Sequence, residues 1–187
     1  MKPASFDYAC PTSKREVLAT LSEHGQDARI IAGGQSLMAI LNMRMTQPKL
    51  LIDINRIEEL SYIKLKKSYL AVGACIRQTE LLSWKGLGEA VPMLSLVMPW
   101  IGHVQTRNRG TVCGSLAHAD PSSELPRWLI TLGGKLVLES TKGRRVLTAE
   151  EFFQGVLTTA CRADELVTEV RFPLGQANTS YRFNEIA

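Results

Sequence analysis

Apolar residues recur at helical spacing in several stretches of the chain. Val17, Leu18 and Leu21 form one such stripe, which follows a capping box at Ser13 to Glu16 and ends at Gly25. This pattern predicts a helix. Shorter helices are predicted from residue 37 onward, over 78–84, over 90–98 with a proline in the first turn, around Trp128, and over 150–153.

Other short apolar runs predict strands. Residues 28–32 and 50–53 are typical of buried strands, so a first subdomain with a small parallel sheet would close near Arg56. Two hairpins are predicted next, the first from 62–65 and 69–73, the second from 135–139 and 145–148. Residues 166–172 alternate as a strand does, and another strand is expected to begin at 181–183.

Two stretches are rich in turn-forming residues. Gly33 to Ser36 separate a predicted strand from a predicted helix, an arrangement that either cradles a phosphate or is a plain turn. Residues 106–126 are dense in small and hydrogen-bonding residues, and Ser122 and Ser123 can cap the helix that carries Trp128. This second stretch predicts either a tight loop before a capped helix or an anion site.

Composition limits the function classes. The chain has 187 residues, 45% of them hydrophobic, and a net charge of +4 that is spread over short basic runs. Nucleic-acid binding is not favoured, because no recognition motif accompanies those runs. No apolar run is long enough to span a bilayer and no secretory signal is visible, so a cytoplasmic protein is predicted. The four cysteines form no Cys-x-x-Cys motif, so no metal site is predicted.

Two motifs carry a family resemblance. Ile-Ala-Gly-Gly-Gln-Ser-Leu at residues 31–37, together with Arg-Gly-Thr-Val-Cys-Gly-Ser-Leu-Ala-His-Ala-Asp-Pro at 109–121, resembles the FAD-binding medium subunit of molybdenum hydroxylases. That family includes the carbon monoxide, nicotine, nicotinate and xanthine dehydrogenase flavoproteins. The resemblance implies the α+β, two-subdomain FAD-binding fold of the vanillyl-alcohol-oxidase (PCMH) type. Residues 1–57 and 58–174 would be its subdomains, and 175–187 would begin a truncated C-terminal domain.

The same resemblance implies cofactor-binding roles, residue by residue. A first loop would hold the FAD pyrophosphate through its backbone, a second loop would approach the diphosphate and the flavin, and further positions would lie beside or line the cofactor. The first-loop residues are Ile31, Ala32, Gly33, Gly34, Gln35, Ser36 and Leu37. The second-loop residues are Thr111, Gly114 and Ser115, and the further positions are Glu124, Ile101 and Val167.

No catalytic acid or base is predicted, because the flavin carries the chemistry. Cys113 replaces a glycine of the family pattern, and a small buried filler is favoured over a redox thiol. His118 is either a catalytic or flavin-attachment residue or, as we favour, a histidine hydrogen-bonded into its loop. Trp84, Trp100 and Trp128 are predicted to be core residues.

The resemblance also implies a function. The chain would bind FAD and pass electrons from a 2Fe–2S small subunit to an external acceptor, while a molybdopterin-binding large subunit hydroxylates the substrate. Two alternatives stay open. One is a stand-alone FAD oxidoreductase of the vanillyl-alcohol-oxidase type, and the other is a non-catalytic remnant that serves as an assembly module.

Overall fold

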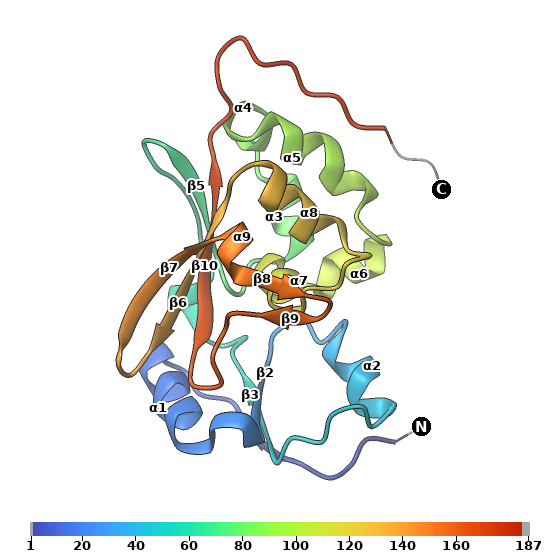
Figure 1. Cartoon of the computed structure of the whole chain (residues 1–187). Helices are drawn as coiled ribbons and strands as arrows, with labels where there is room; N and C mark the ends of the chain where they lie inside the picture. Colours follow the sequence, from blue (N-terminus) through green and yellow to red (C-terminus); the bar gives the residue numbers. More distant parts are fainter. Residues whose placement is uncertain (1, 185–187) are drawn as a thin grey trace.

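The computed structural model describes residues 2–184 of the chain. Two main β-sheets and their helices build the fold, with the smaller sheet in the lower part of Figure 1 and the larger sheet above it. The smaller sheet is parallel and the larger sheet is antiparallel. The prediction of an α+β fold with these two kinds of sheet is therefore confirmed.

The parallel sheet has the strand order β1-β3-β2. Its strands are β1 (Asp7–Ala9), β3 (Leu50–Asp53) and β2 (Ala28–Ile31). The central strand β3 is mostly buried, as predicted, whereas β2 buries only Ala28 fully. Strand β1 was not predicted, because it has three residues of which two are exposed. In a parallel sheet the carboxyl ends of β2 and β3 lie at the same edge, and the chain leaves that edge toward the candidate site.

Helix α1 (Lys14–His24) follows β1 and begins as predicted. The Ser13 hydroxyl accepts a hydrogen bond from the Glu16 backbone N–H at 3.3 Å. The Glu16 carboxylate accepts from the N–H of Thr12 rather than Ser13, so the reciprocal bond of the capping box is displaced by one residue. Gly25 ends the helix with a φ of 50°, a conformation that suits glycine.

The antiparallel sheet has the order β4-β5-β10-β6-β7. These strands are β4 (Ile63–Leu65), β5 (Tyr69–Gly73), β10 (Leu166–Pro173), β6 (Lys135–Ser140) and β7 (Gly143–Thr148). Both predicted hairpins are confirmed, and β10 lies between them. A further two-stranded sheet, β8 (Phe153–Gly155) with β9 (Thr158–Thr159), was not predicted.

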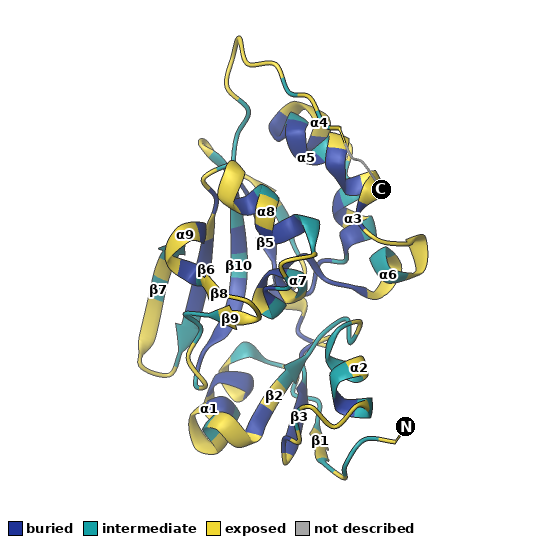
Figure 2. Cartoon of the chain, turned by 45° about the vertical axis from the view of Figure 1, so that its right-hand side comes forward, coloured by how far each residue is buried: buried dark blue, intermediate teal, exposed yellow. Residues whose placement is uncertain are grey.

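The remaining helices gather mainly on one face of the antiparallel sheet, and in Figure 2 their buried sides are dark blue. They are α3 (Gln78–Ser83), α4 (Leu87–Ala90), α5 (Pro92–Val97), α6 (Val104–Arg109), α7 (Val112–His118), α8 (Glu124–Thr131) and α9 (Ala149–Phe152). Helix α2 (Leu37–Asn42) covers the parallel sheet instead. Within residues 2–184, no helix combines the length and the apolar character needed to cross a bilayer.

The central stretch 106–126 differs from its prediction, because most of it is helical. Helix α6 ends inside it, α7 lies within it and α8 begins at its end. The apolar residues Val112, Cys113 and Leu116 are spaced along one face of α7 and are buried where that helix meets β10 and β5. The many small residues therefore allow close packing of helices and do not form one long loop.

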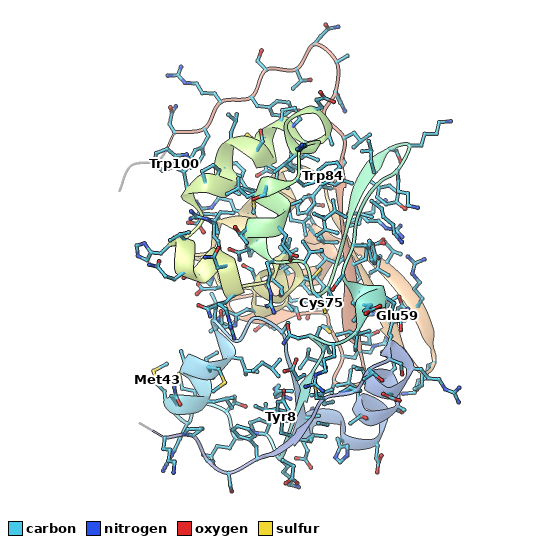
Figure 3. The ribbon with its side chains drawn as sticks, turned by 180° about the vertical axis from the view of Figure 1, so that it is seen from behind. Tyr8, Met43, Glu59, Cys75, Trp84 and Trp100 are labelled. Atoms are coloured by element: carbon cyan, nitrogen blue, oxygen red, sulfur yellow. The ribbon has the colours of Figure 1, made fainter. Side chains whose placement is uncertain are left out.

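After β10 the chain continues without helix or strand to residue 184. The strand expected over 181–183 is therefore wrong. The Phe183 ring instead packs edge-on against Trp128, with ring centroids 5.5 Å apart, and lies 6.5 Å from the Trp100 ring. Trp100 is 62% exposed at the edge of the helices (Figure 3), so its assignment to the core is wrong. Residues 185–187 of the predicted C-terminal domain lie outside the described residues.

Candidate functional site

The glycine turn, residues 32–36, joins β2 to α2. Gly34 has a φ of +70°, which favours glycine. The backbone N–H groups of Gly33, Gly34, Gln35 and Ser36 donate to no acceptor within residues 2–184. The carbonyl oxygen of Gly34 accepts from the N–H of Met38 at 3.1 Å, which starts α2. Four consecutive donors are thus left for solvent or for an anionic ligand.

The threonine turn, residues 109–111, joins α6 to α7. The Thr111 hydroxyl caps α7 by accepting from the N–H of Gly114 at 3.1 Å. The Gly110 carbonyl accepts from the N–H of Gln78 at 2.9 Å, and the N–H of Val112 donates to the Ile76 carbonyl at 3.0 Å. Backbone hydrogen bonds therefore attach this turn to the start of α3.

The two turns touch each other. A Cβ atom built on Gly33 would lie 2.5 Å from the Arg109 carbonyl oxygen and 2.7 Å from the Gly110 Cα. Both of these atoms are backbone, so only glycine fits at residue 33 without a shift of one turn. In Figure 1 the segment between β2 and α2 rises to meet the region of α6 and α7. The fold thus brings the two predicted loops together.

A hydrogen-bonded network joins the turns through two side chains. The Asn55 side chain donates to the Ala32 carbonyl at 2.9 Å. The Arg77 guanidinium donates to the Asn55 side-chain oxygen and also to the Arg109 carbonyl. Neither residue was among the predicted site residues. The position of Asn55, two residues after a predicted parallel strand, was a usable signal, because ligands bind at the carboxyl edge of such sheets.

Asp53, the last residue of β3, is hydrogen-bonded to Asn55 of this network. One of its carboxylate oxygens accepts from the Asn55 N–H at 2.8 Å, and the other accepts from the Tyr8 hydroxyl at 2.5 Å. That hydrogen bond to Asp53 raises the pKa of Tyr8 to about 12. Tyr8 lies in the lower, N-terminal part of the molecule in Figure 3, far from Trp84 and Trp100. The carboxylate therefore connects β1 to the loop after β3.

The structure brings further predicted site residues close to the threonine turn. Ser115, on α7, shares a 3.0 Å hydrogen bond with Ser123, which directly precedes Glu124 at the start of α8. Ile101 and Val167 are different, because both are buried in the hydrophobic core. Val167 pairs with Leu138 inside the antiparallel sheet. Among the described residues, no hydrogen bond connects either of them to the glycine turn.

Cys113 and His118 lie on α7. The Cys113 side chain is buried, with its sulfur 3.7 Å from the Val72 carbonyl oxygen, and burial raises the pKa of its thiol well above the usual range. Cys113 is a filler of the core, as favoured. His118 is half-buried at the end of α7, so it lies on a helix and not in a loop as expected. A hydrogen bond of its ring stays a prediction.

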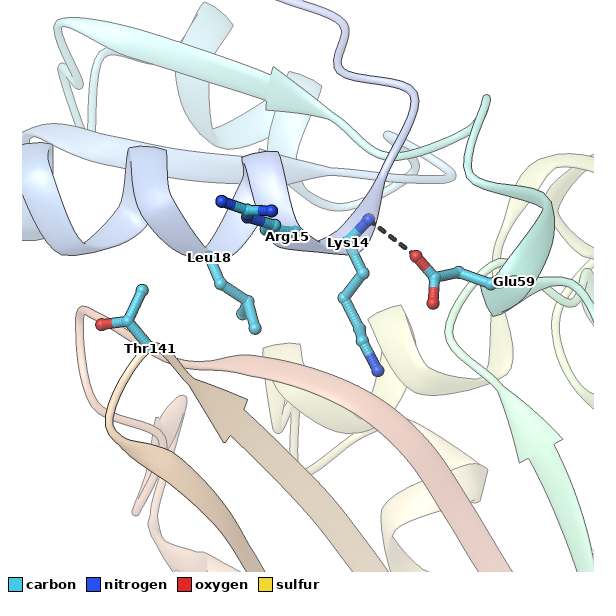
Figure 4. Close-up of a pocket in the computed structure, with 5 residues that line it drawn as sticks. All are labelled: Lys14, Arg15, Leu18, Glu59 and Thr141. Carbon is cyan, nitrogen blue, oxygen red and sulfur yellow. Dashed lines mark hydrogen bonds between the residues drawn. The ribbon is translucent and has the colours of Figure 1, made fainter.

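A surface hollow lies elsewhere, between α1 and the tip of the β6–β7 hairpin (Figure 4). It has a volume of about 400 Å³. Its lining residues are Lys14, Arg15, Leu18, Glu59 and Thr141. The backbone N–H of Lys14 donates to Glu59, and its ammonium group pairs with Glu139 at 2.9 Å. None of the lining residues belongs to either turn, so the hollow is separate from the predicted site.

Comparison with known protein families gives one match over most of the chain. Residues 4–175 match the family described as the FAD binding domain in molybdopterin dehydrogenase. The match includes both turns and the network between them.

Individual proteins are similar over the whole chain. Caffeine dehydrogenase subunit beta of Pseudomonas sp. (strain CBB1) is 43% identical over 100% of this chain and 64% of that protein. The alpha subunit of the 6-hydroxypseudooxynicotine dehydrogenase complex of Paenarthrobacter nicotinovorans is 40% identical, over 100% and 63%. The solved carbon monoxide dehydrogenase of Hydrogenophaga pseudoflava superposes with a TM-score of 0.95 at 36% identity, over 100% and 65%. The chain thus spans slightly less than two thirds of these relatives.

Proposed function

This chain belongs to the family of FAD-binding domains of molybdopterin dehydrogenases, and we propose that it is the FAD-binding part of an electron-transferring subunit in a molybdenum hydroxylase. The family resemblance predicted from the two glycine-containing motifs is confirmed. The electron route, the hydroxylation of the substrate and the partner subunits are proposals, since the chain spans only part of the length of its relatives.

The single observation that carries the proposal is the open backbone of the glycine turn. Four consecutive N–H groups have no acceptor among residues 2–184, and the turn lies at the carboxyl edge of a parallel sheet. Donors of this kind bind phosphate oxygens. We therefore assign the FAD diphosphate to residues 32–36, with Thr111, Gly114 and Ser115 on the adjoining side.

The proposed division of the chain follows from the same geometry. The parallel sheet lies within residues 1–57 and the antiparallel sheet within 58–174. The glycine turn belongs to the first part and the threonine turn to the second. We propose that the cofactor binds where these two subdomains meet, and that each contributes one turn.

When bound, FAD would supply the redox chemistry, and the proposed electron route would run from a 2Fe–2S partner subunit to an external acceptor. The role of this chain is to bind and orient the cofactor. The partners that we propose are that small subunit and a molybdopterin-binding large subunit. The relatives support this proposal, because they are named as subunits or chains of dehydrogenases. A cytoplasmic location stays a prediction.

Flavin binding tests the proposal directly. The purified chain, freed of flavin and titrated with FAD, should quench flavin fluorescence at a stoichiometry of one. The binding should be non-covalent, because His118, the one histidine in the two motifs, does not lie in a recognisable attachment motif. Acid precipitation should therefore leave the yellow colour in the supernatant. Colour in the pellet would contradict non-covalent binding, and no quenching at micromolar protein would contradict the proposed function.

A further inference from the structure

We propose that Arg77 and Asn55 form a clamp that sets the distance between the glycine turn and the threonine turn, and thereby positions the backbone donors for FAD. Neither residue belongs to the two motifs. The inference rests on the proposed function, because the clamp matters for binding only if these turns hold the cofactor.

The contacts of the clamp run from one turn to the other without a gap. Asn55 donates to the Ala32 carbonyl at 2.9 Å, next to the first free N–H of the glycine turn. Arg77 donates to Asn55 and to the Arg109 carbonyl. The same Arg109 oxygen is the atom that a side chain on Gly33 would strike. Clamp and glycine contact therefore meet at one backbone atom.

The orientation of the Asn55 amide is determined by its partners. Its nitrogen donates to both the Ala32 carbonyl and an Asp53 carboxylate oxygen. Only the amide oxygen is then left to face Arg77, and it accepts there. Asp53 is itself held by the Tyr8 hydroxyl. The carboxyl edge of the parallel sheet therefore presents one acceptor to the guanidinium in a fixed direction.

The backbone alone does not fix this distance. The threonine turn is hydrogen-bonded to Ile76 and Gln78 on either side of Arg77. The glycine turn has no such backbone bond to the threonine turn within residues 2–184. A planar guanidinium with several donors suits the task of spanning two acceptors, whereas an ammonium group is a point charge without that fixed geometry. The clamp is thus the polar connection between the two turns.

Loss of the clamp should lower the fraction of molecules in which the turns are correctly spaced, and the apparent dissociation constant for FAD rises in inverse proportion to that fraction. We therefore expect Arg77→Gln and Asn55→Ala each to weaken FAD binding by about tenfold, and the double variant to be little worse than either single one. Arg77→Lys should also weaken binding, because charge alone does not restore the geometry. Fluorescence titration with FAD measures all four proteins.

Arg29→Gln is the matched control. Arg29 lies on the same sheet and donates to two backbone carbonyls, of Gln26 and Ala28, but at the opposite end of β2. Its loss should leave FAD affinity unchanged. The melting temperature of each apo protein and the visible circular dichroism of its bound flavin are recorded as well. A clamp variant should alter the flavin dichroism, which a general loss of stability would not do. Asn55 is exposed, so its variant should fold.

Three results would overturn the inference. The first is wild-type affinity in Arg77→Gln and Asn55→Ala, and the second is full affinity with Arg77→Lys. The third is an equal loss of affinity in Arg29→Gln. Failure of the unaltered chain to bind FAD is a different outcome, because it overturns the proposed function and the clamp together. If the unaltered chain binds FAD and the clamp variants bind it equally well, the clamp is overturned and the proposed function stands.

Discussion

At the scale of single residues, the two glycines of the glycine turn have different reasons to be glycine. Gly34 has a positive φ, and a Cβ there would approach the flexible Met38 side chain at 3.3 Å. Gly33 instead faces the backbone of the threonine turn at 2.5 Å. Flexible side chains move aside more readily than backbone does. Residue 33 is therefore the more restrictive of the two positions.

Gly33→Ala should weaken FAD binding by about tenfold or more and lower the free energy of unfolding by about 1–3 kcal/mol, because overpacking forces the turns apart. Gly34→Ala should have a smaller effect on affinity, since its main cost is the backbone conformation, about 1–2 kcal/mol. Fluorescence titration and urea unfolding measure the two quantities. Gly88→Ala is the control, because a Cβ there meets nothing closer than 3.9 Å. Equal FAD affinity in Gly33→Ala and the unaltered chain would refute the close contact.

At the scale of elements, the loop before β10 is held by a partly buried ion pair, besides the exposed pair of Lys142 with Asp164. The Arg145 guanidinium on β7 donates to both carboxylate oxygens of Glu165, each at 2.7 Å. Arg145 also donates to the Ala160 carbonyl, and the N–H of Arg162 donates to Glu165 at 2.8 Å. Burial favours protonation of Glu165, but the hydrogen bonds from Arg145 and Arg162 outweigh it and lower the pKa of the carboxyl group. The pair therefore holds residues 160–165 against the sheet.

Glu165→Gln should lower the free energy of unfolding at pH 7 by about 1–3 kcal/mol, the range for a lost charged hydrogen bond in a mostly buried place. The folded-state pKa lies below the unfolded value of about 4.3. The carboxylate thus stabilises the fold fully above that value, and its contribution disappears as the pH falls through the folded-state pKa. Urea unfolding between pH 3 and 7 should show a shallower pH dependence in the variant. Glu150→Gln, at an exposed position of α9, should behave like the unaltered chain.

Much of the element list was predictable from the sequence, and the exceptions have physical causes. Apolar periodicity predicts the long strands, and periodicity together with a capping residue predicts α1. Strand β1 is three mostly exposed residues that become a strand only by pairing with β3. The 106–126 stretch misled the prediction because small residues serve turns and close helix packing equally well. Its helical stripe, Val112 to Leu116, was present but short.

At the scale of the whole molecule, the site could be predicted only in part. The two motifs and their family resemblance indicated the glycine turn and the start of α7, and the structure brings these together. The position of Asn55 after β3 was the one usable signal, whereas the contribution of Arg77 was not predictable, because it arises from hydrogen bonds between elements far apart in the sequence. Ile101 and Val167 were assigned by resemblance alone, and their burial in the core leaves their role a prediction.

In the proposed function this chain is an electron-transfer subunit, and another subunit binds the substrate. The FAD-loaded chain alone should therefore keep its visible absorbance when aromatic N-heterocycles, aldehydes or carbon monoxide are added without oxygen. Dithionite should bleach the same sample, which shows that its flavin is reducible. Adding the proposed molybdopterin-binding and 2Fe–2S subunits should make the bleaching depend on substrate. Catalytic bleaching by any of these substrates in the isolated chain would contradict the relay and favour a stand-alone flavin oxidoreductase. A relay requires that substrate leaves the flavin oxidised until the partner subunits are present, although dithionite can reduce it.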